Sequence, residues 1–196
     1  MLVKICGLSD ERHVNHAVAA GADAVGFVFA ESLRQVAPQH ARAISKDVPP
    51  SVKRVAVMLH PSNEDWLKVL DVFAPDILQT DADDYDALDV PYTVERWPVF
   101  REGVSSPGDD ATTYLFEGAR SGQGETVNWA RAAKLAKRGR MILAGGLAAD
   151  NVAEAITMVR PFGVDVSSGV ESSPGQKSSK LISEFIDAAR AAEKRV

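Results

Sequence analysis

Short runs of β-branched and apolar residues alternate with helical patterns along almost the whole chain, and this alternation constrains the fold more than any other feature. Strands that alternate with helices run parallel, because each crossover connection returns the chain to the same edge of the sheet. About eight such units predict an α/β fold of the closed (β/α)8 TIM-barrel type rather than an open doubly wound sheet. The predicted strands span 3–7, 24–29, 53–59, 76–81, 91–99, 113–117, 141–146 and 163–169.

The helical patterns fit the same plan, with one gap after the fifth strand. Trp66, Leu70 and Phe73 share one face of a predicted helix. The region 91–111 contains SSPGDD, which is typical of turns, so we expect a degenerate or missing fifth helix. Because 196 residues is close to the lower size limit of this fold, we expect 1–196 to form a single domain. The predicted helices span 10–21, 38–48, 63–73, 83–88, 129–139, 151–159 and 179–194.

Composition narrows the class of partner. The chain has 22 basic and 27 acidic side chains and a net charge of −5, which argues against a nucleic-acid binder. No apolar run approaches the roughly 20 residues that a membrane helix needs, and the start lacks a signal-peptide pattern. One cysteine cannot form an internal disulfide. We therefore expect a cytoplasmic protein with no nucleic-acid or membrane partner.

Several predicted strands carry polar side chains at one parity only. Side chains at i and i+2 lie on the same face of a strand, so Lys4 lies with Cys6, and Asp165 lies with Ser167. The apolar parity should pack on the helices, which leaves the polar parity inside the barrel. The first and eighth strands are neighbours in a closed barrel, so we expect Lys4 to pair with Asp165, since a buried ammonium without a partner is very costly.

Two inward-facing groups at strand ends suggest acid–base chemistry. Active sites of such barrels lie at the C-terminal ends of the strands, where Cys6 and Glu117 fall. A thiolate and a protonated carboxyl can act as general base and general acid. A nearby Lys4 ammonium favours the thiolate, and apolar walls raise the pKa of a carboxyl. From the pattern alone, Cys6 is equally compatible with a small buried hydrophobe.

Glycines after the last two strands suggest a phosphate site. Gly145 and Gly146 end the predicted seventh strand, and Ser168 and Gly169 end the eighth. Glycine lets backbone N–H groups approach a phosphate closely, and phosphate sites in these barrels often lie between those two loops. Tight turns alone are the alternative explanation for Gly-Gly. A third glycine-rich segment, 121–126, either closes over a ligand or serves only as a loop.

Other polar candidates are weaker. Arg34 lies in the loop after the second strand, where an arginine is usually solvated but beside a pocket would bind an anionic group. His60 follows the third strand and is expected to be an exposed loop residue. No spacing of His, Asp or Glu suggests a metal site.

At the level of motifs, the chain resembles the phosphoribosylanthranilate isomerase family of tryptophan biosynthesis. The segments KICGL, GADAVGFVF, SLRQVAP, GGL, VRPFGVDVSSGVE and PGQK occur in the family's order and cover essentially the whole chain. The resemblance implies a (β/α)8 fold and an Amadori rearrangement of N-(5-phosphoribosyl)anthranilate without cofactor or metal. It implies a phosphorylated small molecule as the binding partner. Whether the protein is a monomer or a homodimer stays open.

The resemblance also implies roles for individual residues. Cys6 would remove the proton from C2 of the ribose, and Glu117 would protonate the furanose ring oxygen. Arg34 would hold the anthranilate carboxylate, while Gln79 and Asp165 would support substrate binding. The group that would cradle the phosphate is Gly145, Gly146, Ser168 and Gly169.

Two positions depart from the family pattern. The general acid is usually Asp, whereas Glu117 adds a methylene and so changes the reach of the carboxyl. Asp81 stands where the family usually has His, and an extra carboxylate near an anionic substrate would repel it unless paired.

Two further functions stay open at this point. One is a related aminoimidazole-ribonucleotide isomerase or a dual-substrate phosphoribosyl isomerase. That chemistry is expected to use a carboxylate at the position of Cys6 and a repeated phosphate site, and neither is evident. The other is a barrel that binds phosphoribosyl ligands without turning them over, which the substitutions at Glu117 and Asp81 slightly favour.

Overall fold

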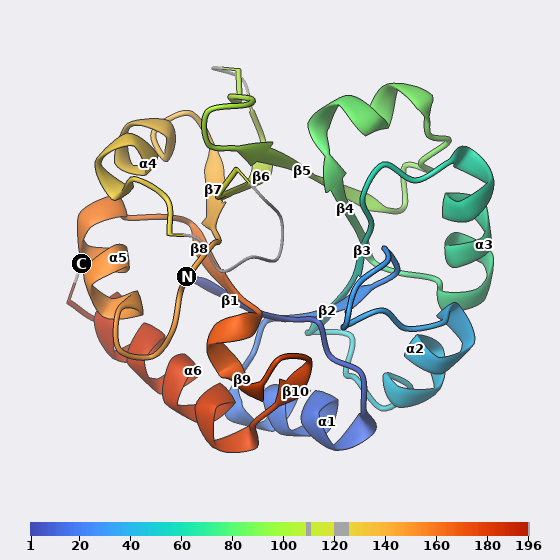
Figure 1. Ribbon diagram of the computed structural model, residues 1–196, viewed down its shortest axis with the longest axis horizontal. Helices are drawn as coiled ribbons and strands as arrows, with labels where there is room; N and C mark the ends of the chain where they lie inside the picture. The colour runs from blue at the N-terminus through green and yellow to red at the C-terminus, as the bar shows by residue number, and fades with distance from the viewer. Residues whose placement is uncertain (109–110, 120–125, 196) are drawn as a thin grey trace.

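The computed structural model describes residues 1–108, 111–119 and 126–195, and it has the predicted barrel (Figure 1). Eight parallel strands close in the order β1 to β8, so the predicted fold class is confirmed. Helices surround this barrel on the outside. The strands are β1 (Leu2–Cys6), β2 (Ala24–Val28), β3 (Lys53–Val57), β4 (Ile77–Asp81), β5 (Glu95–Arg101), β6 (Thr113–Glu117), β7 (Arg140–Leu143) and β8 (Gly163–Val166).

Four of the described α-helices begin at a residue whose side chain caps the helix. The side chains of Asp10, Ser62, Asn128 and Ser178 each accept a hydrogen bond from a backbone N–H of the first helical turn. Gly21 ends the first helix in the left-handed conformation, with φ 100°. The helices are α1 (Glu11–Ala20), α2 (Pro38–Ile44), α3 (Asn63–Phe73), α4 (Trp129–Leu135), α5 (Val152–Val159) and α6 (Ser179–Glu193).

In the part of the chain that the structure describes, the crossovers after β4 and β5 contain no α-helix. A 3-10 helix, η1 (Ala82–Ala87), follows β4, where a short helix was predicted. Between Arg101 and Thr113 the described residues contain no helix, in agreement with the expected loss of the fifth helix. Within the described part of the chain, no helix is long and apolar enough to cross a membrane.

Side-chain parity divides the core into two parts. Outward-facing residues such as Ile5, Phe27 and Phe116 pack with the helices in one large cluster. Inward-facing residues form a second cluster inside the barrel, which includes Trp97 and Leu115. Outward-facing and inward-facing side chains therefore pack in separate apolar clusters. Along the inward face, the apolar residues are followed by polar residues at the C-terminal ends of the strands.

The end of the eighth unit differs from the prediction. The sequence suggested a strand over 163–169, but β8 ends at Val166. A short 3-10 turn, η2 (Ser168–Val170), follows it, and an antiparallel pair of short strands, β9 (Glu171–Ser173) and β10 (Gln176–Lys177), comes next. Backbone that turns immediately after the strand cannot continue the barrel ladder, so these residues form part of the barrel mouth instead.

Candidate active site

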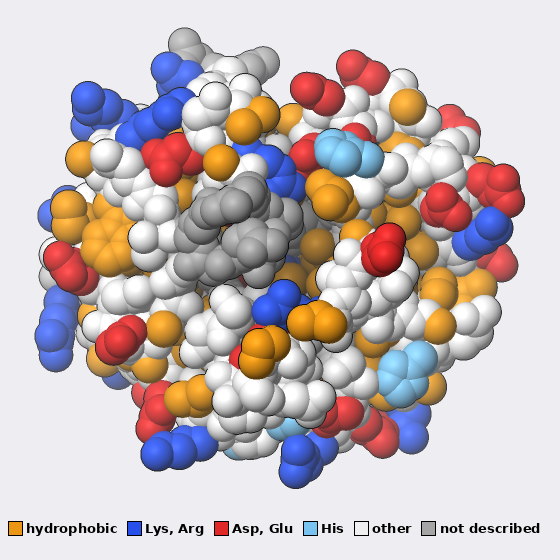
Figure 2. Space-filling model, viewed as in Figure 1, with side chains coloured by type: hydrophobic (Ala, Val, Ile, Leu, Met, Phe, Trp, Pro, Cys, Tyr) orange, Lys and Arg blue, Asp and Glu red, His pale blue; other side chains and the backbone are white. Residues whose placement is uncertain are grey.

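The strand ends place inward-facing polar side chains around one opening of the barrel. Figure 2 shows a hollow at the centre of the face viewed in Figure 1, beside the atoms drawn in grey. Residues 121–125 of the glycine-rich segment 121–126 lie outside the described residues, so the expectation for that loop stays untested. The inward-facing polar residues at the C-terminal ends of the first, fourth, fifth, sixth and eighth units are Cys6, Gln79, Asp81, Arg101, Glu117 and Ser167.

A buried ion pair lies beneath the cysteine, as the sequence predicted. Lys4 and Asp165 face each other in the register of β1 and β8, and Lys4 Nζ donates to Asp165 Oδ1 over 2.8 Å. The Lys4 side chain is fully buried. Burial disfavours its charge, but Asp165 and Cys6 outweigh that effect and raise the pKa of Lys4. Lys4 therefore stays an ammonium ion within the barrel.

The ammonium of Lys4 lies next to the Cys6 thiol because β2 carries a glycine there. A Cβ on Gly26 would lie 3.0 Å from Cys6 Sγ and 3.1 Å from Lys4 Nζ, so both groups gather over the bare backbone. Burial raises the pKa of Cys6, and Lys4 and, more weakly, Lys177 oppose that rise, while Asp165 adds to it. The thiol is thus buried, with a cation positioned to stabilise its thiolate.

The carboxyl predicted as the acid is held by an arginine that the sequence interpretation missed. Arg101 ends β5 and is the register partner of Glu117 on β6. Its Nη1 donates to Glu117 Oε1, while Nη2 and Nε donate to Asp81 over 2.6 and 3.1 Å. Burial raises the pKa of Glu117, and Arg101 opposes that rise. The predicted fifth strand ended at residue 99, so Arg101 fell outside it; extending the inward parity of Trp97 and Val99 would have found it.

Arg34 lies at the mouth, within a second charged cluster. Its Nε and Nη2 donate to the two carboxylate oxygens of Glu171 over 2.6 and 2.9 Å. Lys177 Nζ donates to Glu171 over 2.7 Å and to the carbonyl oxygen of Ser167 over 2.9 Å. Sequence reasoning did not assign Glu171 or Lys177 to the site, although both lie in segments that carried the family resemblance.

Glycine also creates the space for this second cluster. A Cβ on Gly7 would lie 2.7 Å from Arg34 Cδ, 3.0 Å from Ser167 Oγ and 3.4 Å from Lys177 Nζ. Gly7 follows Cys6 directly, so the cluster lies one residue beyond the thiol. Arg34 therefore lies near Cys6, the predicted base, and not in solvent. The edge of its guanidinium that carries Nε and Nη2 is held by Glu171.

The two loops predicted to bind phosphate touch each other. Gly145 and Gly146 have φ of 90° and 62°, a backbone conformation that residues with a Cβ rarely adopt. A Cβ on Gly169 would lie 2.0 Å from the carbonyl oxygen of Leu147, so only glycine fits at this contact. Asn151 holds the first loop, since its Nδ2 donates to Gly146 O over 2.9 Å and its Oδ1 accepts from Ala148 N over 2.9 Å. The structure thus brings the predicted glycines together and adds Asn151 as their support.

Gln79 has a buried oxygen that needs a donor. The residue is 6% exposed, and its Oε1 has no hydrogen-bond partner within the part of the chain that the structure describes. An unpaired buried acceptor costs about 1–3 kcal/mol. Because Gln79 shares the inward parity of Asp81, a ligand with a hydrogen-bond donor would relieve this cost.

The histidine predicted to be exposed is exposed, but it is paired. His60 has φ 46°, and its Nδ1 lies 2.9 Å from Asp84 Oδ1. The hydrogen bond to Asp84 raises the pKa of His60. Its Nε2 lies 3.6 Å from Asp81, so the ring borders the Arg101 cluster. Among the described residues, no three His, Cys, Asp or Glu side chains are arranged to hold a metal ion.

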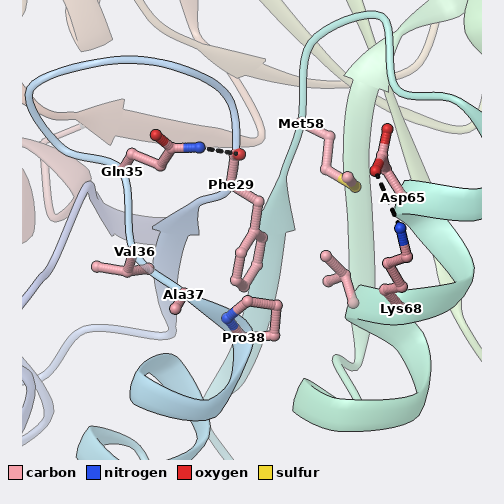
Figure 3. A pocket seen from close by; sticks show the side chains of 9 residues that line it. Phe29, Gln35, Val36, Ala37, Pro38, Met58, Asp65 and Lys68 are labelled. Carbon is pink, nitrogen blue, oxygen red and sulfur yellow. Dashed lines mark hydrogen bonds and ion pairs between the residues drawn. The ribbon is translucent and has the colours of Figure 1, made fainter.

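A separate cavity opens between α2 and α3 (Figure 3). Its volume is about 470 Å³, and Phe29, Met58 and Val69 contribute apolar surface to its lining. It contains none of the predicted site residues. Because the cavity lies between the outer helices, away from the convergent charged groups, the chemistry belongs to the barrel mouth.

The chain is similar to known proteins over almost its whole length. Residues 3–188 match the family model described as N-(5′-phosphoribosyl)anthranilate (PRA) isomerase. The N-(5′-phosphoribosyl)anthranilate isomerase of Streptococcus mutans is 36% identical over 96% of this chain and 98% of its own, and that of Bordetella petrii is 39% identical over 99% and 97%.

Solved structures give the same result. The phosphoribosyl anthranilate isomerase of Thermus thermophilus superposes with a TM-score of 0.85 at 32% identity, covering 97% of this chain and 99% of its own. Another, in complex with reduced 1-(o-carboxyphenylamino)-1-deoxyribulose 5-phosphate, has a TM-score of 0.80 at 32% identity, covering 97% and 100%. The chain therefore belongs to the N-(5′-phosphoribosyl)anthranilate isomerase family.

Proposed function

We propose that this protein catalyses the Amadori rearrangement of N-(5′-phosphoribosyl)anthranilate, a step of tryptophan biosynthesis, with Cys6 as general base and Glu117 as general acid. The observation that carries the proposal is that the Cys6 thiol lies beside the buried Lys4 ammonium. Glu117, held by Arg101, lies at the same mouth of the barrel. Both groups are at strand ends with inward parity, where this fold places its catalytic residues.

The reaction needs two proton transfers. Glu117 donates a proton to the furanose ring oxygen as the bond from C1 to that oxygen breaks, and the nitrogen lone pair forms the open-chain iminium ion. The Cys6 thiolate then takes the proton from C2, and the electron pair of the C–H bond forms the C1–C2 double bond of an enolamine. Tautomerisation gives the ketone product. Burial raises the pKa of Glu117 and so favours its acid form. Burial also raises the pKa of Cys6, and the Lys4 ammonium opposes that rise by stabilising the thiolate that the base needs.

Binding is assigned to the groups around this pair. Arg34 holds the anthranilate carboxylate, and Gln79 and Asp165 support the substrate from inside the barrel. Backbone N–H groups of the loops that contain Gly145, Gly146, Ser168 and Gly169 hold the phosphate, which the close contact of Gly169 with Leu147 supports.

The proposal extends to the protein as a whole. The chain, 1–196, acts as one domain in the cytoplasm, as a monomer or homodimer. A solved relative from Thermotoga maritima, described as a dimeric enzyme of which monomers were made, supports both oligomeric states. The steps above use only side-chain and backbone groups of this chain.

The test is fluorescence decay of freshly generated N-(5′-phosphoribosyl)anthranilate with wild type, Cys6→Ser and Glu117→Gln. We expect wild type to turn over and each variant to lose about 10²–10⁴-fold in kcat. Glu64→Gln, on an 81% exposed side chain of α3, is the control and should keep wild-type activity. A fully active Glu117→Gln would assign the acid elsewhere, with Asp81 as the next candidate. A wild type that binds product but has no activity would instead indicate a non-catalytic barrel.

A further inference from the structure

Arg101 joins two carboxylates across the ends of three neighbouring strands. Asp81 ends β4, Arg101 ends β5 and Glu117 ends β6. Two nitrogens of the guanidinium, Nη2 and Nε, donate to Asp81, and the third, Nη1, donates to Oε1 of Glu117. A planar fork bound along one edge has a fixed orientation, so its remaining nitrogen also has a fixed position.

The cluster is shielded from water. The side chains of Arg101, Asp81 and Glu117 are 11%, 18% and 15% exposed. Charge-assisted hydrogen bonds between such groups are stronger and more rigid than those of exposed pairs. The arrangement thus restrains Glu117, whose side chain is one methylene longer than the family's usual aspartate.

We infer that Arg101, anchored by Asp81, is a positioning residue that fixes Oε1 of Glu117 and leaves Oε2 to carry the proton delivered to the substrate. The inference rests on the proposed function, because it assigns a partner to the proposed acid. It also gives Asp81 a role: this carboxylate, in place of the family's usual histidine, is the anchor and counter-charge for the guanidinium.

The charges that face Glu117 shift its pKa in opposite directions. Burial raises the pKa of Glu117 and Arg101 lowers it, while Asp165 from β8 and Asp81 from β4 raise it. Arg101 alone would favour the carboxylate, which cannot donate a proton. Asp81 offsets that effect, and His60 borders Asp81 on its exposed side, with Nε2 3.6 Å away.

The experiment compares pH profiles of turnover and separates charge from positioning. The variants are Arg101→Met, which removes both, Arg101→Lys, which keeps the charge but loses the fork, and Asp81→Asn, which removes the anchor. Arg96→Met, on the same strand with its guanidinium donating to Val90 O, is the matched control. Turnover should change with pH in two limbs, one set by the pKa of the base and the other by the pKa of the acid. Cys6 is the chain's only cysteine, so the pH dependence of its alkylation rate gives the pKa of the base directly. The remaining limb of the turnover profile is then assigned to Glu117 and is called the Glu117 limb.

We expect the Glu117 limb to move to higher pH in Arg101→Met and to lower pH in Asp81→Asn, and to stay in place in Arg96→Met. In Arg101→Lys the limb should stay near its wild-type position while kcat falls about 10- to 100-fold, because a lysine cannot hold both carboxylates in one geometry. Arg101→Lys with wild-type kcat, or an unmoved limb in a folded Arg101→Met, would overturn the inference. If wild type itself fails to turn over the substrate, the proposed function fails instead.

Discussion

At the scale of single residues, the interior of the barrel depends on one buried ion pair. Lys4 and Asp165 come from opposite ends of the sequence and meet only because the barrel closes between β1 and β8. A buried ion pair gains little over an apolar pair of similar size, but breaking it leaves an uncompensated charge. The pair is therefore explained by the cation it places beside Cys6 rather than by stability.

This reasoning predicts unequal effects for single and double substitutions. Asp165→Leu should lower the free energy of unfolding by about 3–5 kcal/mol, because it leaves the Lys4 ammonium buried without a partner. Lys4→Met combined with Asp165→Leu should recover most of that loss. Urea unfolding of the three proteins measures both quantities. Equal stability of the single and double variants would contradict the ion-pair account.

At the scale of elements, the site depends on loops that only glycine allows to touch. η2 and the loop after β7 meet where Gly169 faces the carbonyl oxygen of Leu147. Backbone groups cannot move aside as the end of a flexible side chain can, so the contact fixes how far apart the two loops lie. In the proposed function the N–H groups of both loops hold the phosphate, so this contact would set the distance between those donors.

We therefore expect Gly169→Ala to separate the two loops. The added Cβ would lie 2.0 Å from Leu147 O, which should cost about 1–3 kcal/mol of stability and raise KM at least several-fold. The control is Gly103→Ala, where a Cβ meets nothing within 4 Å and only the positive φ is strained. Thermal unfolding and the turnover assay measure the two effects. An unchanged KM in Gly169→Ala would place the phosphate elsewhere.

At the scale of the whole molecule, ion pairs join the two ends of the chain around the mouth and the base of the barrel. Glu171 accepts from Arg34, 137 positions earlier, and from Lys177 on β10. At the other end, Arg190 of α6 donates to Asp23 and to Met1 O over 2.7 and 2.6 Å. These contacts tie the last unit to the first two.

The Glu171 cluster predicts a dependence of stability on pH. Burial raises the pKa of Glu171, but its hydrogen bonds to Arg34 and Lys177 outweigh burial and lower the pKa to about 2. A folded-state pKa below the unfolded value of 4.5 gives stability that is present above about pH 4.5 and is lost as pH falls toward 2. The shift corresponds to about 3 kcal/mol.

Urea unfolding between pH 7 and pH 3 tests this expectation. Glu171→Gln should be less stable than wild type at pH 7 by up to about 3 kcal/mol, and the difference should shrink as pH falls. Glu64→Gln, on an exposed side chain, should follow wild type throughout. If the free energies of unfolding of wild type and Glu171→Gln differ by the same amount at every pH, this carboxylate does not contribute to the loss of stability in acid.

The sequence by itself determined the barrel and the residues that face its interior. Alternating strands and helices require parallel pairing, and the period of two along a strand assigns each side chain to one face, so Lys4, Cys6, Asp165 and Glu117 could be placed inward. Both arguments use only local geometry, and neighbouring strands follow from chain order.

Apart from the pair of Lys4 and Asp165, only the tertiary structure decided which charged groups of the mouth meet. Arg101 lies beyond the predicted end of its strand, and Glu171 lies in a hairpin that was predicted neither as strand nor as site. Their partners Asp81, Glu117, Arg34 and Lys177 come from other units. Long side chains at strand ends can reach several neighbours, and the choice among them depends on where each strand stops and each loop turns. Those positions are set by packing across the barrel, which no local pattern in the sequence records.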